Sequence, residues 1–171
     1  MIDRLIRGAG LGLALLGATS ASAATTAPMN SKALLLKPLT LTKLNDLDFG
    51  TIIPSGTSDD YVRIDAQTGN RTSPTANLVA TNPGGRARFA SSGLNNVLVF
   101  LELSPPPYAA LTNATGKTLK VEYINLDGPG LRLLTPLSQV FFVGIGGEIR
   151  VRSDQEEGDY SGTFSLTANY L

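Results

Sequence analysis

The sequence contains no cysteine and no histidine. Without cysteine, the chain can form no disulfide and can hold no metal through thiolates. Without histidine, it can build neither a Ser–His–Asp nor a Cys–His catalytic centre, and imidazole metal sites are excluded as well. No nucleophile–base pair can be assembled from the residues that remain. We therefore expect no enzymatic activity, no catalytic residues, no cofactor and no bound metal.

An excess of one charge is also lacking. The chain has 14 basic and 14 acidic residues, and its formal net charge is zero. No basic patch interleaved with aromatic residues is present, which is the pattern that nucleic-acid-binding proteins show. We therefore expect no nucleic-acid partner.

The first 23 residues have the pattern of an export signal. Arg4 and Arg7 precede a small, apolar stretch at residues 8–18, and Ala21-Ser22-Ala23 is a cleavage motif of the A-x-A type. The apolar stretch is too short for a membrane-spanning helix, which needs about 20 residues. We expect residues 1–23 to be a signal peptide and the protein to be exported. A buried N-terminal helix is the alternative.

Short alternating segments separated by Gly, Pro and Asn turns fill the rest of the chain. Alternation of apolar and polar residues is typical of strands with one buried face. The expected strands are Leu39–Thr42, Tyr61–Asp65, Leu78–Ala80, Arg86–Ala90, Val97–Leu103, Lys117–Asn125, Val140–Ile145 and Glu148–Arg152. No segment after residue 23 predicts a helix. The sequence therefore indicates an all-β sandwich, with residues 37–171 as one domain.

Three of these segments carry more specific expectations. The segment at 97–103 is apolar on both faces, because Leu98 and Phe100 alternate with valine and leucine, and this predicts a central strand. Gly146-Gly147 between two apolar segments predicts a hairpin. In the segment at 117–125, the apolar face contains Leu119, Val121 and Tyr123.

Two acidic stretches are candidates for turns. Asp59-Asp60 is expected to be a solvated turn. The second stretch contains Asp154, Glu156, Glu157 and Asp159. Its carboxylates could bind a hard cation such as calcium, but their spacing is not that of a calcium-binding loop. We expect a solvated turn here too.

The last 14 residues show the most regular pattern. From Tyr160 onward, one face carries Tyr160, Gly162, Phe164, Leu166, Ala168 and Tyr170, and the intervening residues are polar except for the final Leu171. This predicts one long strand with a buried face. Unpaired backbone on such a strand is an aggregation hazard unless another segment pairs with it.

This ending resembles the C-terminal strand of chaperone–usher pilus subunits. In that family an aromatic residue is next to last and a glycine is fourteenth from the end, which are the positions of Tyr170 and Gly158. A second motif, Leu47-Asp48-Phe49-Gly50 after Pro38–Thr42, is similar to the early motif of an uncharacterised secreted bacterial family whose members end in G-x-Y-x-G-x-F-x-x-T-x-N-Y. That family is similar to spore-coat-U-like proteins and to archaic chaperone–usher pilins.

The resemblance implies an immunoglobulin-like, pilin-like β-sandwich that lacks one strand, and a structural subunit of a fimbria-like fibre. In pilins the C-terminal strand borders a groove that a chaperone strand fills first and the N-terminal extension of another subunit fills later. The implied partners are other copies or related subunits, a periplasmic chaperone and an outer-membrane usher. The protein would cross the periplasm and end at the cell surface or in an extracellular fibre. The assembly contact would be formed by Gly158, Tyr160, Phe164, Leu166, Ala168 and Tyr170.

The candidate donor strand is the N-terminal extension at residues 24–36. Its apolar residues Ala27, Met29, Ala33 and Leu35 all have odd numbers, so they would lie on one face of an extended strand. Ser31 interrupts this row, and Pro28 removes one donor from a strand ladder. The alternative is a sandwich that completes itself, with the N-terminal segment paired beside residues 160–170 of the same chain. The protein would then be a secreted monomeric binding module or adhesin.

Overall fold

The computed structural model describes residues 32–105, 109–135 and 140–171. The chain divides into two units, Met1–Leu34 and Leu35–Leu171, and the fold described below is that of the second. The predicted signal peptide, with Ala27 and Met29 of the candidate donor strand, lies outside the described residues. The predicted boundary between residues 36 and 37 stays a prediction.

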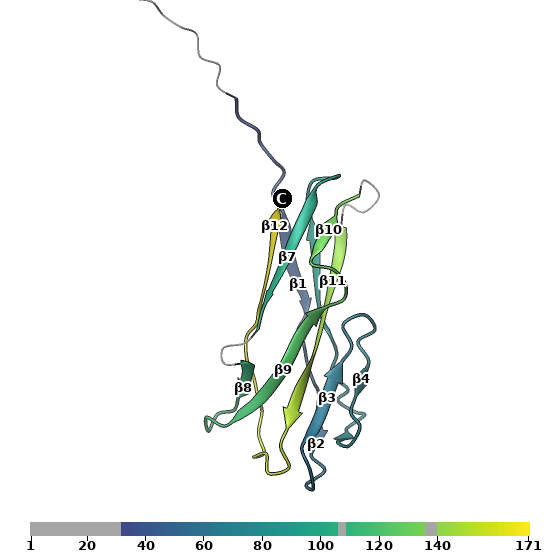
Figure 1. The fold of residues 1–171 in the computed structure, drawn as a ribbon, viewed down its shortest axis with the longest axis vertical. Coiled ribbons are helices and arrows are strands. Elements are labelled where there is room, and N and C mark those ends of the chain that lie inside the picture. The colour runs from purple at the N-terminus through teal and green to yellow at the C-terminus, as the bar shows by residue number, and fades with distance from the viewer. Residues whose placement is uncertain (1–31, 106–108, 136–139) are drawn as a thin grey trace, which may run out of the picture. The chain divides into compact units, whose positions relative to one another are not determined.

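Antiparallel β-strands are the regular elements of the second unit, and the described residues contain no α-helix (Figure 1). Accordingly, none of the described residues belongs to a helix that could cross a membrane. The strands are β1 (Thr40–Asn45), β2 (Ile52–Ile53), β3 (Asp60–Ile64), β4 (Arg71–Thr72), β5 (Asn77–Leu78), β6 (Ala87–Ser92), β7 (Leu98–Ser104), β8 (Ala110–Thr112), β9 (Thr118–Leu126), β10 (Leu131–Leu133), β11 (Val140–Val151) and β12 (Ser165–Tyr170). The predicted all-β, sandwich-like fold is confirmed.

The larger sheet is organised around β11, whose two halves have different neighbours. The first half pairs with β6, which in turn pairs with β1. The second half lies between β3 and β9, and β4 and β8 extend the sheet beyond them. The predicted hairpin at Gly146-Gly147 is wrong, because β11 continues through both glycines.

Gly146 and Gly147 do not form a turn. They allow the backbones of neighbouring strands to pack closely against β11. A Cβ atom on Gly146 would lie 2.2 Å from the carbonyl oxygen of Ile64, and one on Gly147 would lie 2.6 Å from that of Tyr123. Contacts this short exclude any side chain at these positions. Glycine inside a strand often marks such an approach of a second backbone.

The smaller sheet has the order β10-β7-β12, so the predicted central position of β7 is confirmed. Val99 and Leu101 are buried on its inner face. Its outer face is not covered, since Leu98 is 41% exposed and Phe100 is 43% exposed. The two faces of β7 are both apolar in sequence, but only the inner face is buried. A short two-stranded sheet, β2 with β5, completes the fold.

The buried face of β9 changes partway along the strand. Leu119 and Val121 are buried as predicted, but Tyr123 is exposed. The cause is a shift of register, because Val121 pairs with Ile149 whereas Tyr123 pairs with Glu148. A bulge of this kind inserts one extra residue and inverts the alternation beyond it.

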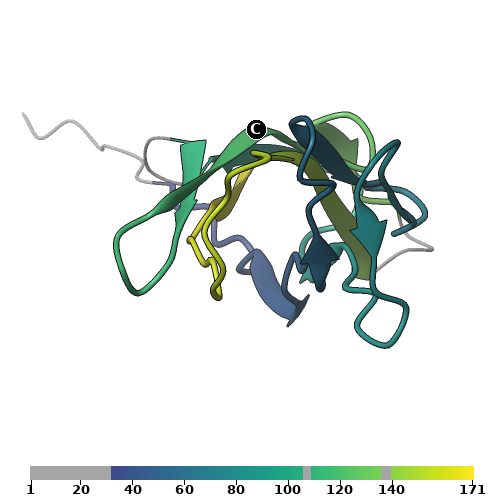
Figure 2. The ribbon, with the colours of Figure 1, turned by 90° about the horizontal axis from the view of Figure 1, so that it is seen from below.

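Two clusters of buried side chains form the core inside the curled sheets, which Figure 2 shows nearly end-on. One contains Phe49, Val62, Ile64, Leu119, Val121, Ile149 and Val151. The other contains Ala87, Val99, Leu101, Leu134, Val143 and Ile145. Full burial of a large apolar side chain stabilises a fold by about 1.5–3 kcal/mol. Several residues at the border of the first cluster, such as Leu47 and Tyr160, are only half-buried.

Asp60 is completely buried, so the predicted solvated turn at residues 59–60 is wrong for this residue. Its carboxylate accepts hydrogen bonds from the backbone N–H of Ser55 at 2.7 Å and from the hydroxyl of Thr75. Burial raises the pKa of Asp60, but the hydrogen bonds from Thr75 and Ser55 outweigh burial and lower it overall. A buried carboxylate is tolerated here because these donors replace water.

Candidate functional site

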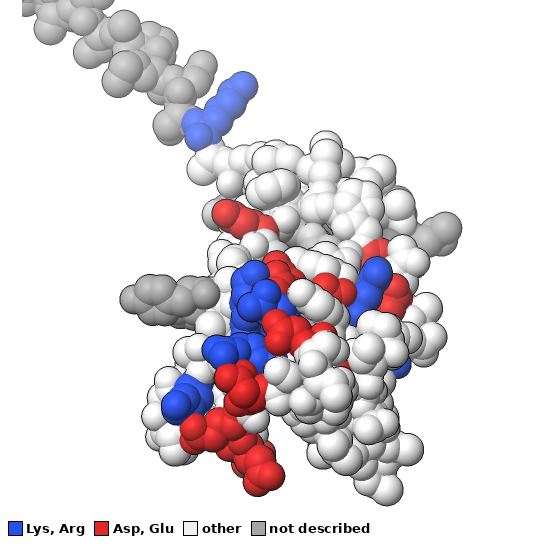
Figure 3. All heavy atoms as spheres, turned by 60° about the horizontal axis from the view of Figure 1, so that its bottom comes forward, with Lys and Arg blue, Asp and Glu red and all other residues white. Residues whose placement is uncertain are grey.

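A groove of about 840 Å³ lies between two segments that are far apart in the sequence. One wall is formed by residues 46–54, and the other by residues 155–162 with Phe164. Side chains of β8, β9 and β11 form an apolar floor: Leu111, Leu119, Val121, Ile124, Ile149 and Val151. Figure 3 shows the lower end of the domain, where the surface is hollowed. The groove therefore exposes one side of the first core cluster.

The Leu-Asp-Phe-Gly motif builds the first wall. Asp48 exchanges two backbone hydrogen bonds with Gly85, of 2.9 and 2.7 Å. The guanidinium of Arg71 donates to the carbonyl oxygens of Phe49, at 2.8 Å, and of Val79, at 2.7 Å. The motif is thus clamped from two sides, which keeps Phe49 in the core and this wall in place.

Two glycines allow that clamp to close. Gly50 has a φ of +67° and Gly84 has a φ of +65°, which other residues adopt only with strain. A Cβ atom on Gly84 would lie 2.1 Å from the carbonyl oxygen of Asp48. The glycine of the motif and the glycine of the facing turn therefore permit the two backbones to meet.

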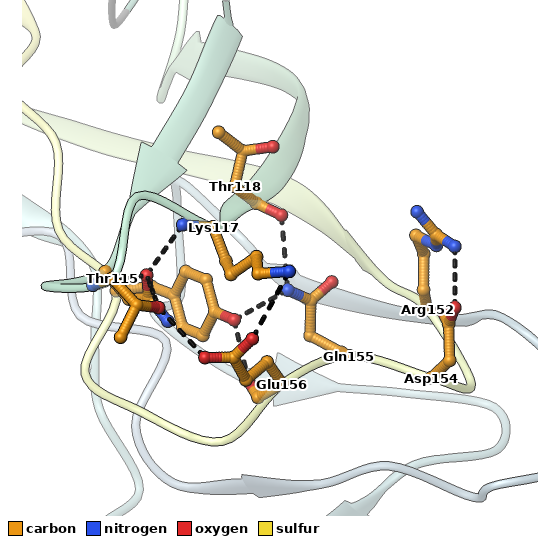
Figure 4. Close-up of polar contacts among 9 residues, drawn as sticks. Thr115, Lys117, Thr118, Arg152, Asp154, Gln155 and Glu156 are labelled. Atoms are coloured by element: carbon orange, nitrogen blue, oxygen red, sulfur yellow. Dashed lines mark hydrogen bonds and ion pairs between the residues drawn. The ribbon is translucent and has the colours of Figure 1, made fainter.

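The acidic turn builds the second wall, and side chains anchor it to the β8–β9 hairpin (Figure 4). The amide of Gln155 donates to the hydroxyl of Tyr160 at 2.7 Å and to the carbonyl of Thr118 at 3.2 Å. Glu156 accepts a hydrogen bond from the hydroxyl of Thr115 at 2.9 Å and lies 3.5 Å from the ammonium of Lys117. The turn is therefore held in place, although it was expected to be only solvated.

Gly158 lies within this turn. Its φ of +146° is one that glycine adopts most readily, and a Cβ atom there would lie 3.3 Å from the amide nitrogen of Asn113. The glycine fourteenth from the end thus sets the bend that leads the chain from the turn toward β12.

The predicted strand from Tyr160 to Tyr170 is shorter than expected. Only Ser165–Tyr170 forms β12, because Ser161 makes a bridge to Thr112 of β8 before the chain crosses to β7. The predicted alternation nevertheless holds in the burial of the side chains. Those half-buried toward the interior are Tyr160, Phe164, Leu166, Ala168 and Tyr170. Gly162 is exposed, contrary to its predicted place on the buried face.

The strand edges beside the groove are unpaired in the described part of the chain. There β12 pairs with β7 alone, and β1 pairs with β6 alone. The N–H of Leu171 donates to the carbonyl of Leu98 at 3.0 Å. Because an antiparallel ladder repeats every two residues, the N–H groups of Leu166, Ala168 and Tyr170 point away from β7, to the open edge.

Tyr170 defines the upper end of this edge. Its hydroxyl donates to the carbonyl of Lys37 at 3.0 Å and accepts from the N–H of Leu94 at 2.8 Å. Its side chain packs on the second core cluster, as does that of Leu39. The groove lining ends at Phe164 and includes no residue of β12 or β1.

The described residues of the candidate donor segment form no strand. Ala33 and Leu35 belong to none, and Leu35, which is part of the second unit, is 94% exposed. Among the described residues, no group of three or more acidic side chains is placed to hold a metal ion. What the site offers is an apolar floor and free backbone groups along one edge.

These features define an all-β, sandwich-like domain with an uncovered strand edge beside an apolar groove. The chain belongs to the family described as a domain of unknown function (DUF4402), whose model matches residues 39–170. The match includes both motifs that build the walls of the groove, Leu47–Gly50 and the ending from Gly158 to Tyr170. No curated protein and no solved structure matches the chain.

Proposed function

We propose that the protein is a structural subunit of a fimbria-like surface fibre, assembled when one chain donates a strand to the next. The observation that carries this proposal is the groove with its open edge. An extended segment laid beside residues 160–167 would pair with the outward N–H group of Leu166, and its side chains would cover the apolar floor. Addition of a strand to a sheet edge supplies affinity through backbone bonds and specificity through alternate side chains.

The energy available in such a contact is large. Each apolar side chain that becomes fully buried contributes roughly 1.5–3 kcal/mol. The apolar side chains of the donor become buried, and half-buried side chains of the acceptor, such as those of Phe164 and Leu166, become more buried. A handful of such positions is enough for a complex that dissociates extremely slowly.

The place where the N-terminal extension joins the domain also favours a fibre. Lys37 lies beside Tyr170, at the far end of β12 from the groove wall at residues 155–162. A domain that gives a strand at one end and receives one at the other has a head-to-tail interface. Such an interface produces an open filament unless a rotation closes it into a ring.

The test compares three versions of the chain: one beginning at Ala24, one lacking residues 24–36, and one in which residues 24–36 follow Leu171 after a linker long enough to bring them beside residues 160–167. In the third version the added segment folds back along β12 as an antiparallel strand. We expect the first to form polymers that resist SDS, the second to stay monomeric with lower stability, and the third to be a monomer of clearly higher stability. Size exclusion and thermal unfolding measure this.

A matched control is the third version with Met29→Asp and Leu35→Asp, which places carboxylates on the face directed to the apolar floor. It should lose the added stability. Three monomers of equal stability would contradict donor-strand assembly. They would favour the alternative, a secreted binding module that needs no partner strand.

A further inference from the structure

Among the described residues, acidic side chains line the groove and no basic side chain does. Among the described residues that line it, the charged ones are Asp46, Asp48, Glu156, Glu157 and Asp159. The whole sequence has equal numbers of basic and acidic residues. The imbalance is therefore a property of the groove lining, while Figure 3 shows that basic side chains lie beside the acidic ones on the surface around it.

Part of this negative charge has no counterpart in the described residues. Lys43 and Lys117 pair with two of the five carboxylates, and the N–H of Gly50 donates to a third. Glu157 and Asp159 form no ion pair within the described part of the chain. Both are exposed on the rim, one on each side of the glycine at the bend.

We propose that this rim selects an incoming strand with a basic residue, and that Lys32 of a second copy supplies that residue by lying opposite Asp159. The inference rests on the proposed function and adds the pair of residues that fixes the register and the partner. The groove would be occupied by residues 24–36 of a second copy. The rim would recognise an ammonium group next to a row of apolar side chains.

The alternation of side chains along a strand places the two charges on the same face. Ala33 and Leu35 would be directed to the groove floor, so Lys32, which lies between them and the preceding inward residue, would be directed outward. On the acceptor, Tyr160 is directed inward, and Asp159 before it is exposed. Outward side chains of neighbouring strands lie side by side, with Cβ atoms about 4.5–5.5 Å apart when directly opposite.

The orientation follows from where the donor's domain must lie. Its extension ends at residue 36, so the donor's domain begins a few residues after Lys32. With the strand antiparallel to β12, that domain lies beyond the acidic rim. The opposite orientation would carry it to the Tyr170 end, where the acceptor's own extension leaves at Lys37.

The same register matches side chains by size. When the ladder of β12 continues through residues 160–164, which form no strand in the single chain, Lys32 opposite Asp159 places Met29 opposite Gly162, Ala27 opposite Phe164 and Ala24 opposite Thr167. A long side chain then fills the place where the acceptor has none, and a methyl group faces an aromatic ring. Close packing favours such alternation of large and small residues.

The first experiment measures binding of a fluorescent peptide of residues 24–36 to the monomeric fraction of the chain beginning at Ala24. We expect Lys32→Glu in the peptide to weaken binding about tenfold at 50 mM NaCl and much less at 500 mM, because salt screens exposed pairs. Asp159→Lys in the chain should restore binding of the Lys32→Glu peptide. Asp154→Lys is the matched control, since Asp154 is in the same turn but does not line the groove, and it should restore nothing.

The outcomes separate the two proposals. If the unaltered peptide does not bind at any salt concentration, the proposed function fails, and the selection by charge fails with it. If the peptide binds but Lys32→Glu and salt have no effect, donor-strand assembly stands and the acidic rim is not a selector.

A second experiment uses the absence of cysteine from the chain. With oxidised glutathione as the oxidant, a peptide with Lys32→Cys should form a disulfide with Asp159→Cys in the chain, because Cα atoms about 4.4–6.8 Å apart can be bridged. Asp154→Cys should remain unlinked. Equal cross-linking at both positions, or linking at Asp154 alone, would overturn the proposed register.

Discussion

The hydroxyl of Tyr170 donates a hydrogen bond to the carbonyl of Lys37 across 133 positions of sequence. It joins the end of the last strand to the segment that leads into the first one. The same oxygen accepts from the N–H of Leu94, so one side chain connects three segments. The next-to-last aromatic residue therefore fixes the spacing of the two strand edges that border the open side of the sandwich.

Tyr170→Phe should lower the free energy of unfolding by about 1–2 kcal/mol, because the N–H of Leu94 loses its acceptor in a partly buried place. Tyr123→Phe is the control, since Tyr123 lies at the surface. Urea denaturation of the two variants measures the difference. Equal stability would show that the hydroxyl of Tyr170 contributes nothing to the fold.

Gly84→Ala should destabilise the fold by more than about 2 kcal/mol, since the new methyl group combines a strained φ with a collision against the carbonyl of Asp48. Gly116→Ala is matched to it, with a φ of +83° and open space around the position, and it should cost about 1 kcal/mol. Denaturation midpoints compare the two. If both substitutions cost the same, the clamp on the Leu-Asp-Phe-Gly motif is looser than its geometry indicates.

Asp60 should make the fold less stable in acid. Its pKa is lower in the folded chain than the ordinary value of 3.8, so the carboxylate stabilises the fold above that value, and this contribution is lost as the pH falls through the folded pKa. We expect Asp60→Asn to be less stable than the parent at pH 7 and to lose less stability between pH 4 and pH 2.

The control for this pH dependence is Asp159→Asn, which changes an exposed carboxylate. Its unfolding curve should follow that of the parent over the whole range. If Asp60→Asn retains the full acid sensitivity of the parent, the carboxylate of Asp60 is not its source.

Alternation predicted most of the strands, because a strand with one buried face has period two whatever its neighbours are. The buried side chains of Val62 and Leu101 were found in this way. The pattern failed where a neighbouring strand intervened. The bulge that exposes Tyr123 depends on the register with β11, and Gly146 is required by the backbone of β3 and not by a turn.

The walls of the groove were predicted only in part. The two motifs that form them stand out in the sequence, but the partners that hold them do not. Arg71 is in the two-residue strand β4 and residues 82–85 form a turn, and both stretches are too short to show a period that points to the motif. The burial of Asp60 was missed for the same reason, since its donors, Ser55 and Thr75, are in turns on either side of β3.

Residue-resolved amide hydrogen exchange of the labelled monomer, with and without unlabelled peptide of residues 24–36, tests most directly whether the edge of β12 receives a strand. We predict that the amide of Leu166 exchanges rapidly in the free chain and becomes protected when the peptide is added, whereas the amides of Ala168 and Tyr170, which lie beyond Ala24 of the peptide, stay unprotected. The amides of Thr167 and Asn169, which face β7, should be protected in both samples. Protection of the amide of Leu166 in the free monomer, or no change in it on adding the peptide, would contradict the account.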